Sequence, residues 1–144
     1  MARVFTGTQN STDKTINAID RKRQREREQI LNRAREHAFT LSTKLVQRLL
    51  DRHILETSSE QAMRDSFSSA IRAATEMEDF DLQFKIAPLR TLVADPNFFS
   101  LYLTQFIIED LVNHPKIDDV YGDNLDIYLA VDSVVLQLDS LAET

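Results

Sequence analysis

Between Gly7 and Pro88 the chain contains neither glycine nor proline, and this uninterrupted stretch restricts its fold more than any other feature. The whole sequence has only two Gly and three Pro. Sandwiches and barrels need many tight turns, and phosphate-binding loops are rich in glycine. The sequence therefore predicts an all-α fold, and it argues against dinucleotide-binding and P-loop chemistry.

Helix-start signals and apolar periodicity predict four main helices, with a short turn or helix near residues 88–94. The second helix is expected to begin with a capping box, formed either by Thr57 with Glu60 or by Ser58 with Gln61. The link that precedes it is short, which favours antiparallel packing of the first two helices. We expect the helices at about residues 13–54, 58–78, 96–113 and 124–142, in a fold that resembles a four-helix bundle.

The third and fourth predicted helices begin at recognisable caps. Asp95 is expected at the N-cap of the third helix, with Pro96 at its first helical position. Either Asp123 or Asn124 is expected to cap the fourth helix, with Asp126 near the positive end of the helix dipole.

The first predicted helix changes character along its length. Apolar residues follow one stripe from Leu31 to Leu49, whereas residues 20–29 include no apolar side chain. Burying guanidinium groups without partners is costly, so the contact with the core should end near Ile30. The domain organisation predicted from this change is a flexible N-terminal arm (1–12), a basic helical stem that projects from the core (13–29) and a single all-α domain (30–144).

Residues 80–86 alternate strictly between apolar and polar side chains, which is the pattern of a β-strand. No second strand candidate lies nearby, and a lone strand leaves its backbone groups unpaired. An extended linker or a short helix is therefore expected, anchored by Phe80, Leu82, Phe84 and Ile86.

The third predicted helix is apolar on almost every side, and the apolar stripe of the fourth is too wide for a helix that lies only on the surface. Such helices form the centre of a fold or the face of an oligomer. We expect the final two helices and residues 30–54 to form the core. The residues assigned to this core or oligomer face are Phe98, Phe99, Tyr102, Phe106, Val131, Val134 and Leu138.

Charge is divided unequally along the chain. Residues 1–55 contain twelve Lys and Arg against six Asp and Glu, whereas residues 56–144 contain five against seventeen. Such asymmetry indicates partners rather than fold. It permits a basic arm that binds nucleic acid or an acidic protein, and it permits two copies that pair head to tail.

A run of basic side chains in the predicted stem is the main candidate for binding a partner. Projecting basic helices neutralise phosphates, but acidic residues are interleaved here, no aromatic residue is near, and the chain has a pI near 5.0. Docking on an acidic protein or simple solvation accounts for the run equally well. The residues assigned to this site are Arg21, Lys22, Arg23, Arg25, Arg27, Arg33 and Arg35.

Catalytic and metal-binding patterns are weak. The chain has no cysteine, which excludes disulfides, thiolate zinc sites, iron–sulfur clusters and cysteine nucleophiles. Asp110 and His114 stand four apart and acidic residues gather around Gly122, but helix ends and a solvated turn account for both groups. We therefore expect no catalytic residue, no bound metal and no cofactor.

These observations favour a non-catalytic interaction protein, a small helical subunit or adaptor that self-associates or docks into a larger complex. The alternative is a nucleic-acid-binding accessory protein that uses the basic stem. No apolar stretch approaches the length of a membrane span, and the amino terminus lacks the apolar run of a signal peptide. The chain is therefore expected to be cytoplasmic, with a protein partner or a second copy of itself.

Overall fold

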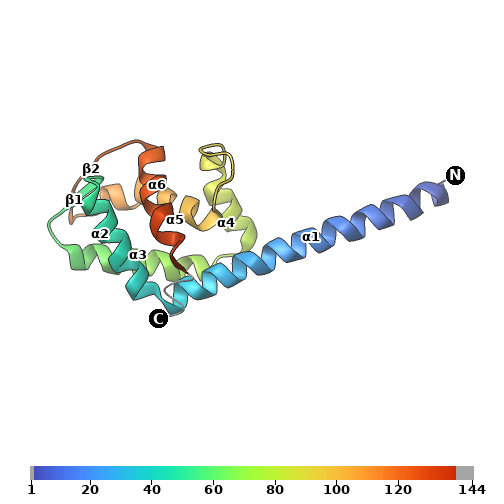
Figure 1. The fold of residues 1–144 in the computed structure, drawn as a ribbon, viewed down its shortest axis with the longest axis horizontal. Coiled ribbons are helices and arrows are strands. Elements are labelled where there is room, and N and C mark those ends of the chain that lie inside the picture. Colours follow the sequence, from blue (N-terminus) through green and yellow to red (C-terminus); the bar gives the residue numbers. More distant parts are fainter. Residues whose placement is uncertain (1, 139–144) are drawn as a thin grey trace. The chain divides into compact units, whose positions relative to one another are not determined.

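The computed structural model describes the backbone of residues 2–138 and the side chains of residues 16–138. The described chain is all-α, apart from one short two-stranded sheet, and its elements are coloured along the sequence in Figure 1. It divides into two compact units, Met1–Ile30 and Leu31–Thr144. The α-helices are α1 (Ala2–Glu36), α2 (Ala38–Asp51), α3 (Glu60–Glu76), α4 (Asp79–Ile86), α5 (Phe98–Glu109) and α6 (Asn124–Val135).

The predicted first helix is two helices, α1 and α2, which meet at His37. Helix α1 begins at Ala2, so residues 2–12 of the predicted arm are helical in backbone. Helix α2 ends at Asp51, before the predicted end near Ile54, because His53 takes a left-handed conformation with φ of 56°. Its amide and that of Ile54 bond back to the carbonyls of the last turn. No glycine marks this helix end, so the sequence did not reveal it.

Two short strands, β1 (Leu55–Thr57) and β2 (Ile117–Val120), pair antiparallel in a sheet that the sequence analysis did not predict. Because the pairing puts Thr57 opposite Ile117, both Thr57 Oγ1 and the Ser58 amide donate hydrogen bonds to the carbonyl of the adjacent Lys116. Neither residue is therefore the helix cap that was expected. Ser59 caps α3 instead, and its hydroxyl accepts a 3.2 Å hydrogen bond from the Ala62 amide.

Residues 79–86 form helix α4, which confirms the short helix and excludes the strand for this segment. Helical spacing puts Leu82 and Ile86 on the buried side, at 1% and 2% exposure. It puts Phe80 and Phe84 on the opposite side, at 75% and 76% exposure. The prediction that these two phenylalanines anchor the segment is therefore wrong. The 3-10 helix η1 (Ala87–Leu89) follows, close to the predicted turn near residues 88–94.

Helix α5 is capped by Asn97, not by Asp95 as predicted. The Asn97 side chain accepts hydrogen bonds from the amides of Phe99 and Ser100. The prediction for α6 is confirmed, since Asp123 and Asp126 form a reciprocal capping box. Helix α6 ends at Val135, and residues 139–142 of its predicted range lie outside the described residues.

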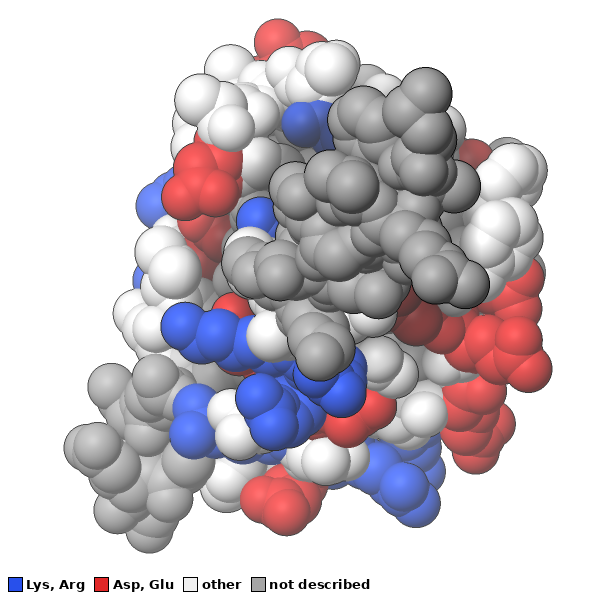
Figure 2. Space-filling view, turned by 90° about the vertical axis from the view of Figure 1, so that its right-hand side faces the viewer, with Lys and Arg blue, Asp and Glu red and all other residues white. Residues whose placement is uncertain are grey.

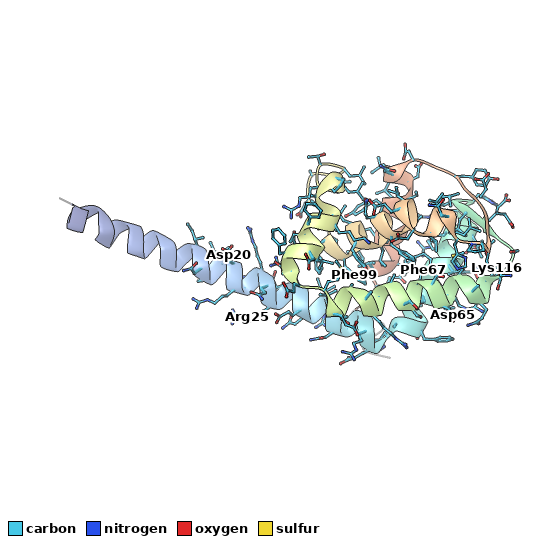
Figure 3. All side chains as sticks on the ribbon, turned by 180° about the vertical axis from the view of Figure 1, so that it is seen from behind. Asp20, Arg25, Asp65, Phe67, Phe99 and Lys116 are labelled. Carbon is cyan, nitrogen blue, oxygen red and sulfur yellow. The ribbon has the colours of Figure 1, made fainter. Side chains whose placement is uncertain are left out.

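The core of Leu31–Thr144 lies where α2 packs on α3 and α6, and where α5 packs on α4 and α6. The predicted stripe of the first helix is buried, from Ala34 through Leu41 and Leu45 to Leu49. Phe67 of α3 and Phe99 of α5 point into this interior (Figure 3), and neither side chain is exposed.

Candidate functional site

A groove of about 700 Å³ lies within the helical domain, between α3 and the elements α4, α5 and η2 (Leu111–Asn113). This volume is within the range of binding sites for small molecules or peptide segments. One wall consists of small side chains that recur along α3 at spacings of three and four residues. These residues are Ala62, Ser66, Ser69, Ala70 and Ala73.

The small side chains on this face of α3 project only a short distance from the helix backbone. The Ser66 hydroxyl donates a 3.0 Å hydrogen bond to the carbonyl of Ala62 in its own helix, so it is internally satisfied. A partner segment can therefore pack close to the surface of α3, but this wall does not present polar groups that converge on a ligand.

The facing wall is aromatic and aliphatic. It is formed by Tyr102 and Phe106 of α5 and by Leu111. The Phe106 ring packs edge to face on the buried Phe67, with ring centroids 5.7 Å apart. Burial, and to a smaller extent the charge of Asp110, raises the pKa of the Tyr102 hydroxyl above its ordinary value of 10.0. Tyr102 is therefore a neutral hydrogen-bond donor at physiological pH.

Charged side chains also line the groove. Lys85 Nζ lies 3.5 Å from Asp110 Oδ2 and 5.8 Å from the centroid of the Tyr102 ring. Asp65 and His114 also line the groove. Asp65 is exposed on α3 and accepts a 3.0 Å hydrogen bond from the side chain of Gln61.

The predicted pair of Asp110 and His114 lines one groove, but each side chain has another partner in the structure. Asp110 pairs with Lys85, and His114 Nδ1 accepts a 3.1 Å hydrogen bond from the Lys116 amide. Two of the acidic residues around Gly122, Asp123 and Asp126, form the capping box of α6, so helix capping accounts for them. Among the described residues, no group of three or more metal-ligating side chains is arranged to hold a metal ion.

The predicted basic site lies on α1 and is exposed over most of its length. The side chains of Arg21, Lys22, Arg23 and Arg25 are exposed, and Arg27 is half-buried. Arg33 and Arg35, also exposed, belong to the last turn of the same helix. Figure 2 shows one face on which Lys and Arg side chains gather, with Asp and Glu side chains among and beside them.

Residues assigned to the core or an oligomer face are mostly inside the helical domain. Phe99, Tyr102, Val131, Val134 and Leu138 are buried, whereas Phe98 and Phe106 are half-buried. The groove itself was not predicted. Its sequence signal is the recurrence of Ala and Ser along residues 62–73, which the sequence analysis did not use.

No family model matches the chain, and no curated protein or solved structure matches it either. Within the described residues, no helix combines the length and the apolar character needed to cross a membrane. The fold and the groove therefore define the chain only as an all-α protein with an open groove in its helical domain.

Proposed function

We propose that the protein is a non-catalytic interaction protein, a small cytoplasmic helical subunit or adaptor, and that the α3–α5 groove receives a segment of its protein partner. The observation that carries the proposal is the lining of this groove. One wall consists of small side chains, the other is apolar, and charged groups also line the groove, as in grooves that accept an amphipathic helix.

The polar groups of the groove support binding rather than catalysis. Lys85 and Asp110 pair with each other, and His114 Nδ1 is engaged by the Lys116 amide. Nucleophilic catalysis needs a nucleophile, a base and an orienting group that converge on one point. The groove instead combines its charged groups with apolar side chains, which suits recognition of an extended surface.

The proposal is tested by filling the groove. Ala73 is exposed and lines the groove, so Ala73→Trp should block it without disturbing the core. Ala94 is an exposed alanine outside the groove, and Ala94→Trp is the matched control. We expect self-association and partner capture to be lost in Ala73→Trp and kept in Ala94→Trp. If both variants keep all of these interactions, the groove is not the binding site and the proposal fails.

A second candidate function, supported by the exposed side chains from Arg21 to Arg25, is nucleic-acid binding by the basic stem. Contacts to phosphates release counterions, so such binding weakens steeply as salt rises. We expect binding to mixed-sequence duplex DNA, measured by fluorescence anisotropy, to disappear when Arg21, Arg23 and Arg25 are replaced by Gln. Absence of binding at low salt, or binding that survives these substitutions, would exclude this function.

A further inference from the structure

We infer that the occupant of the α3–α5 groove is a helix formed by residues 16–27 of a second copy of this chain, and we call this segment the stem helix. The inference rests on the proposed function, because it names the partner of the same groove. Three observations carry it: the charges of the two units, the length of the groove wall, and the apolar face of the stem helix.

Charge is complementary between the two units. Met1–Ile30 contains seven Lys and Arg against four Asp and Glu, a net charge of +3. Leu31–Thr144 contains ten against nineteen, a net charge of −9. Opposite fields steer association and favour one orientation over others. The groove has the same negative sign as its unit, because it is lined by two carboxylates, Asp65 and Asp110, and by one ammonium group, Lys85.

The groove wall and the stem helix match in length. A helix rises about 1.5 Å per residue, so the small residues from Ala62 to Ala73 and the segment 16–27 each span about 17 Å. Distances between packed helix axes depend on the side chains at the contact, and Ala and Ser allow the closest approach. A second helix can therefore lie along α3 over the whole groove.

The stem helix presents a suitable face. Residues along a helix are rotated by about 100° from one to the next, so Ile16, Ile19 and Arg23 lie on one side. Ile16 and Ile19 are 50% and 46% exposed. Against the groove they would pack on the half-buried ring of Phe106, while the Arg23 guanidinium reaches the carboxylates of the groove. Because the stem is already helical, little conformational entropy is lost on docking.

A phosphate backbone does not suit the groove equally well. The carboxylates of Asp65 and Asp110 repel it, and the charge of Leu31–Thr144 is negative as a whole. The same carboxylates attract a basic helix, which is why we assign the groove to the stem helix of another copy.

The first test is charge reversal, read by sedimentation equilibrium of the full chain. We expect Arg23→Glu to weaken the dimer by about tenfold or more, since it replaces an attractive interfacial charge with a repulsive one. Arg21 lies on nearly the opposite side of the stem helix, so Arg21→Glu is the matched control and should change the dimer far less. Mixing Arg23→Glu with the Asp65→Lys, Asp110→Lys variant should restore association, because each copy then supplies the missing charge.

The second test uses the absence of cysteine from the chain. Asp20→Cys, at the edge of the docking face, and Ser69→Cys, in the groove, are made in separate chains of different mass and mixed with a short bismaleimide. We expect a covalent dimer of the two different chains. Arg21→Cys mixed with Ser69→Cys is the control and should cross-link far less.

The outcomes separate this inference from the proposed function. A dimer that is lost in Ala73→Trp but gives no cross-link between Asp20→Cys and Ser69→Cys overturns the stem-helix assignment and keeps the groove as the interface. A monomer at all concentrations that captures a different protein through the groove also overturns the assignment alone. If the double variant with Asp20→Cys and Ser69→Cys forms the cross-link only within one chain, the contact is intramolecular, and this outcome also overturns the stem-helix assignment. Association that Ala73→Trp leaves unchanged overturns both.

Discussion

The hydroxyl of Tyr102 donates a 3.0 Å hydrogen bond to the carbonyl of Ala70, and this bond joins α5 to α3 beside the groove. Tyr102 is 3% exposed. Both residues also line the groove, so this hydrogen bond, together with the packing of Phe106 on Phe67, holds its two walls together. Loss of this contact should affect the stability of the domain and the shape of the groove together.

The first prediction is a loss of stability at alkaline pH. Burial raises the pKa of Tyr102 and of Tyr128 above 10.0, although the hydrogen bond with the Asn97 amide partly lowers that of Tyr128. A raised pKa in the folded state means that folding favours the neutral phenol. The resulting stability is complete below pH 10.0 and is lost as pH rises through the raised values.

Urea unfolding at a series of alkaline pH values measures this effect. We expect the free energy of unfolding to fall above the ordinary tyrosine pKa, and Tyr102→Phe should reduce the slope because residue 102 no longer titrates. An equal slope in Tyr102→Phe and in the unchanged protein would show that Tyr102 does not contribute.

The second prediction concerns the contact between α5 and α6. The hydroxyl of Ser100 donates a 2.7 Å hydrogen bond to Asp132 Oδ1, and Ser100 is completely buried. Hydrogen bonds to charged groups contribute about 1.5–3 kcal/mol. We expect Ser100→Ala to destabilise the domain by about 1.5 kcal/mol, toward the lower limit because Asp132 is partly exposed.

A double-mutant cycle with Asp132→Ala checks this assignment, with free energies of unfolding measured by denaturant titration. The two single substitutions should not add, because each one removes the same bond. Strictly additive losses would mean that the bond contributes nothing to stability.

The sequence predicted the helical class, the buried stripe of α2 and the Asp123 cap because these depend on local spacing and local hydrogen bonds. It did not predict the boundary at His37 or the end of α2 at His53, since neither place has a glycine or proline. The β1–β2 pairing was also missed. Leu55 and Val120 are partners although they lie 65 residues apart in the sequence, and no local pattern indicates such a contact.

The candidate site was predicted less well than the fold. The exposure of Arg21, Lys22, Arg23 and Arg25 follows from the absence of apolar neighbours in residues 20–29. The groove, however, results from how α3, α4 and α5 pack. Small residues along one helix face are compatible either with tight packing or with an open wall, and only the tertiary arrangement distinguishes the two.

The third prediction separates the two sides of α4. Leu82 is 1% exposed and Phe84 is 76% exposed, although both are apolar and only two residues apart. We expect Leu82→Ala to destabilise the domain by about 2–5 kcal/mol, because it removes buried methyl groups and leaves a cavity. Phe84→Ala should change stability by less than about 0.5 kcal/mol. Thermal unfolding of both variants measures the difference, and a larger loss in Phe84→Ala would mean that this segment is not the helix described.

The fourth prediction concerns the turn that precedes α6. Gly122 has φ of +86°, a conformation that other residues adopt only with strain. A Cβ atom at this position would also lie 3.1 Å from Asp126 Cβ, which is tighter than normal packing. Asp126 closes the capping box with Asp123, so the substitution strains the turn and disturbs the start of α6.

We expect Gly122→Ala to destabilise the domain by about 1–2 kcal/mol, the cost of a left-handed conformation for an L-residue. Asn124→Ala is the matched control, because Asn124 is exposed and lies outside the strained position. Denaturant unfolding followed by circular dichroism compares the two variants. Equal stability of Gly122→Ala and the unchanged protein would show that the turn accepts a side chain and that α6 can begin without a glycine at this position.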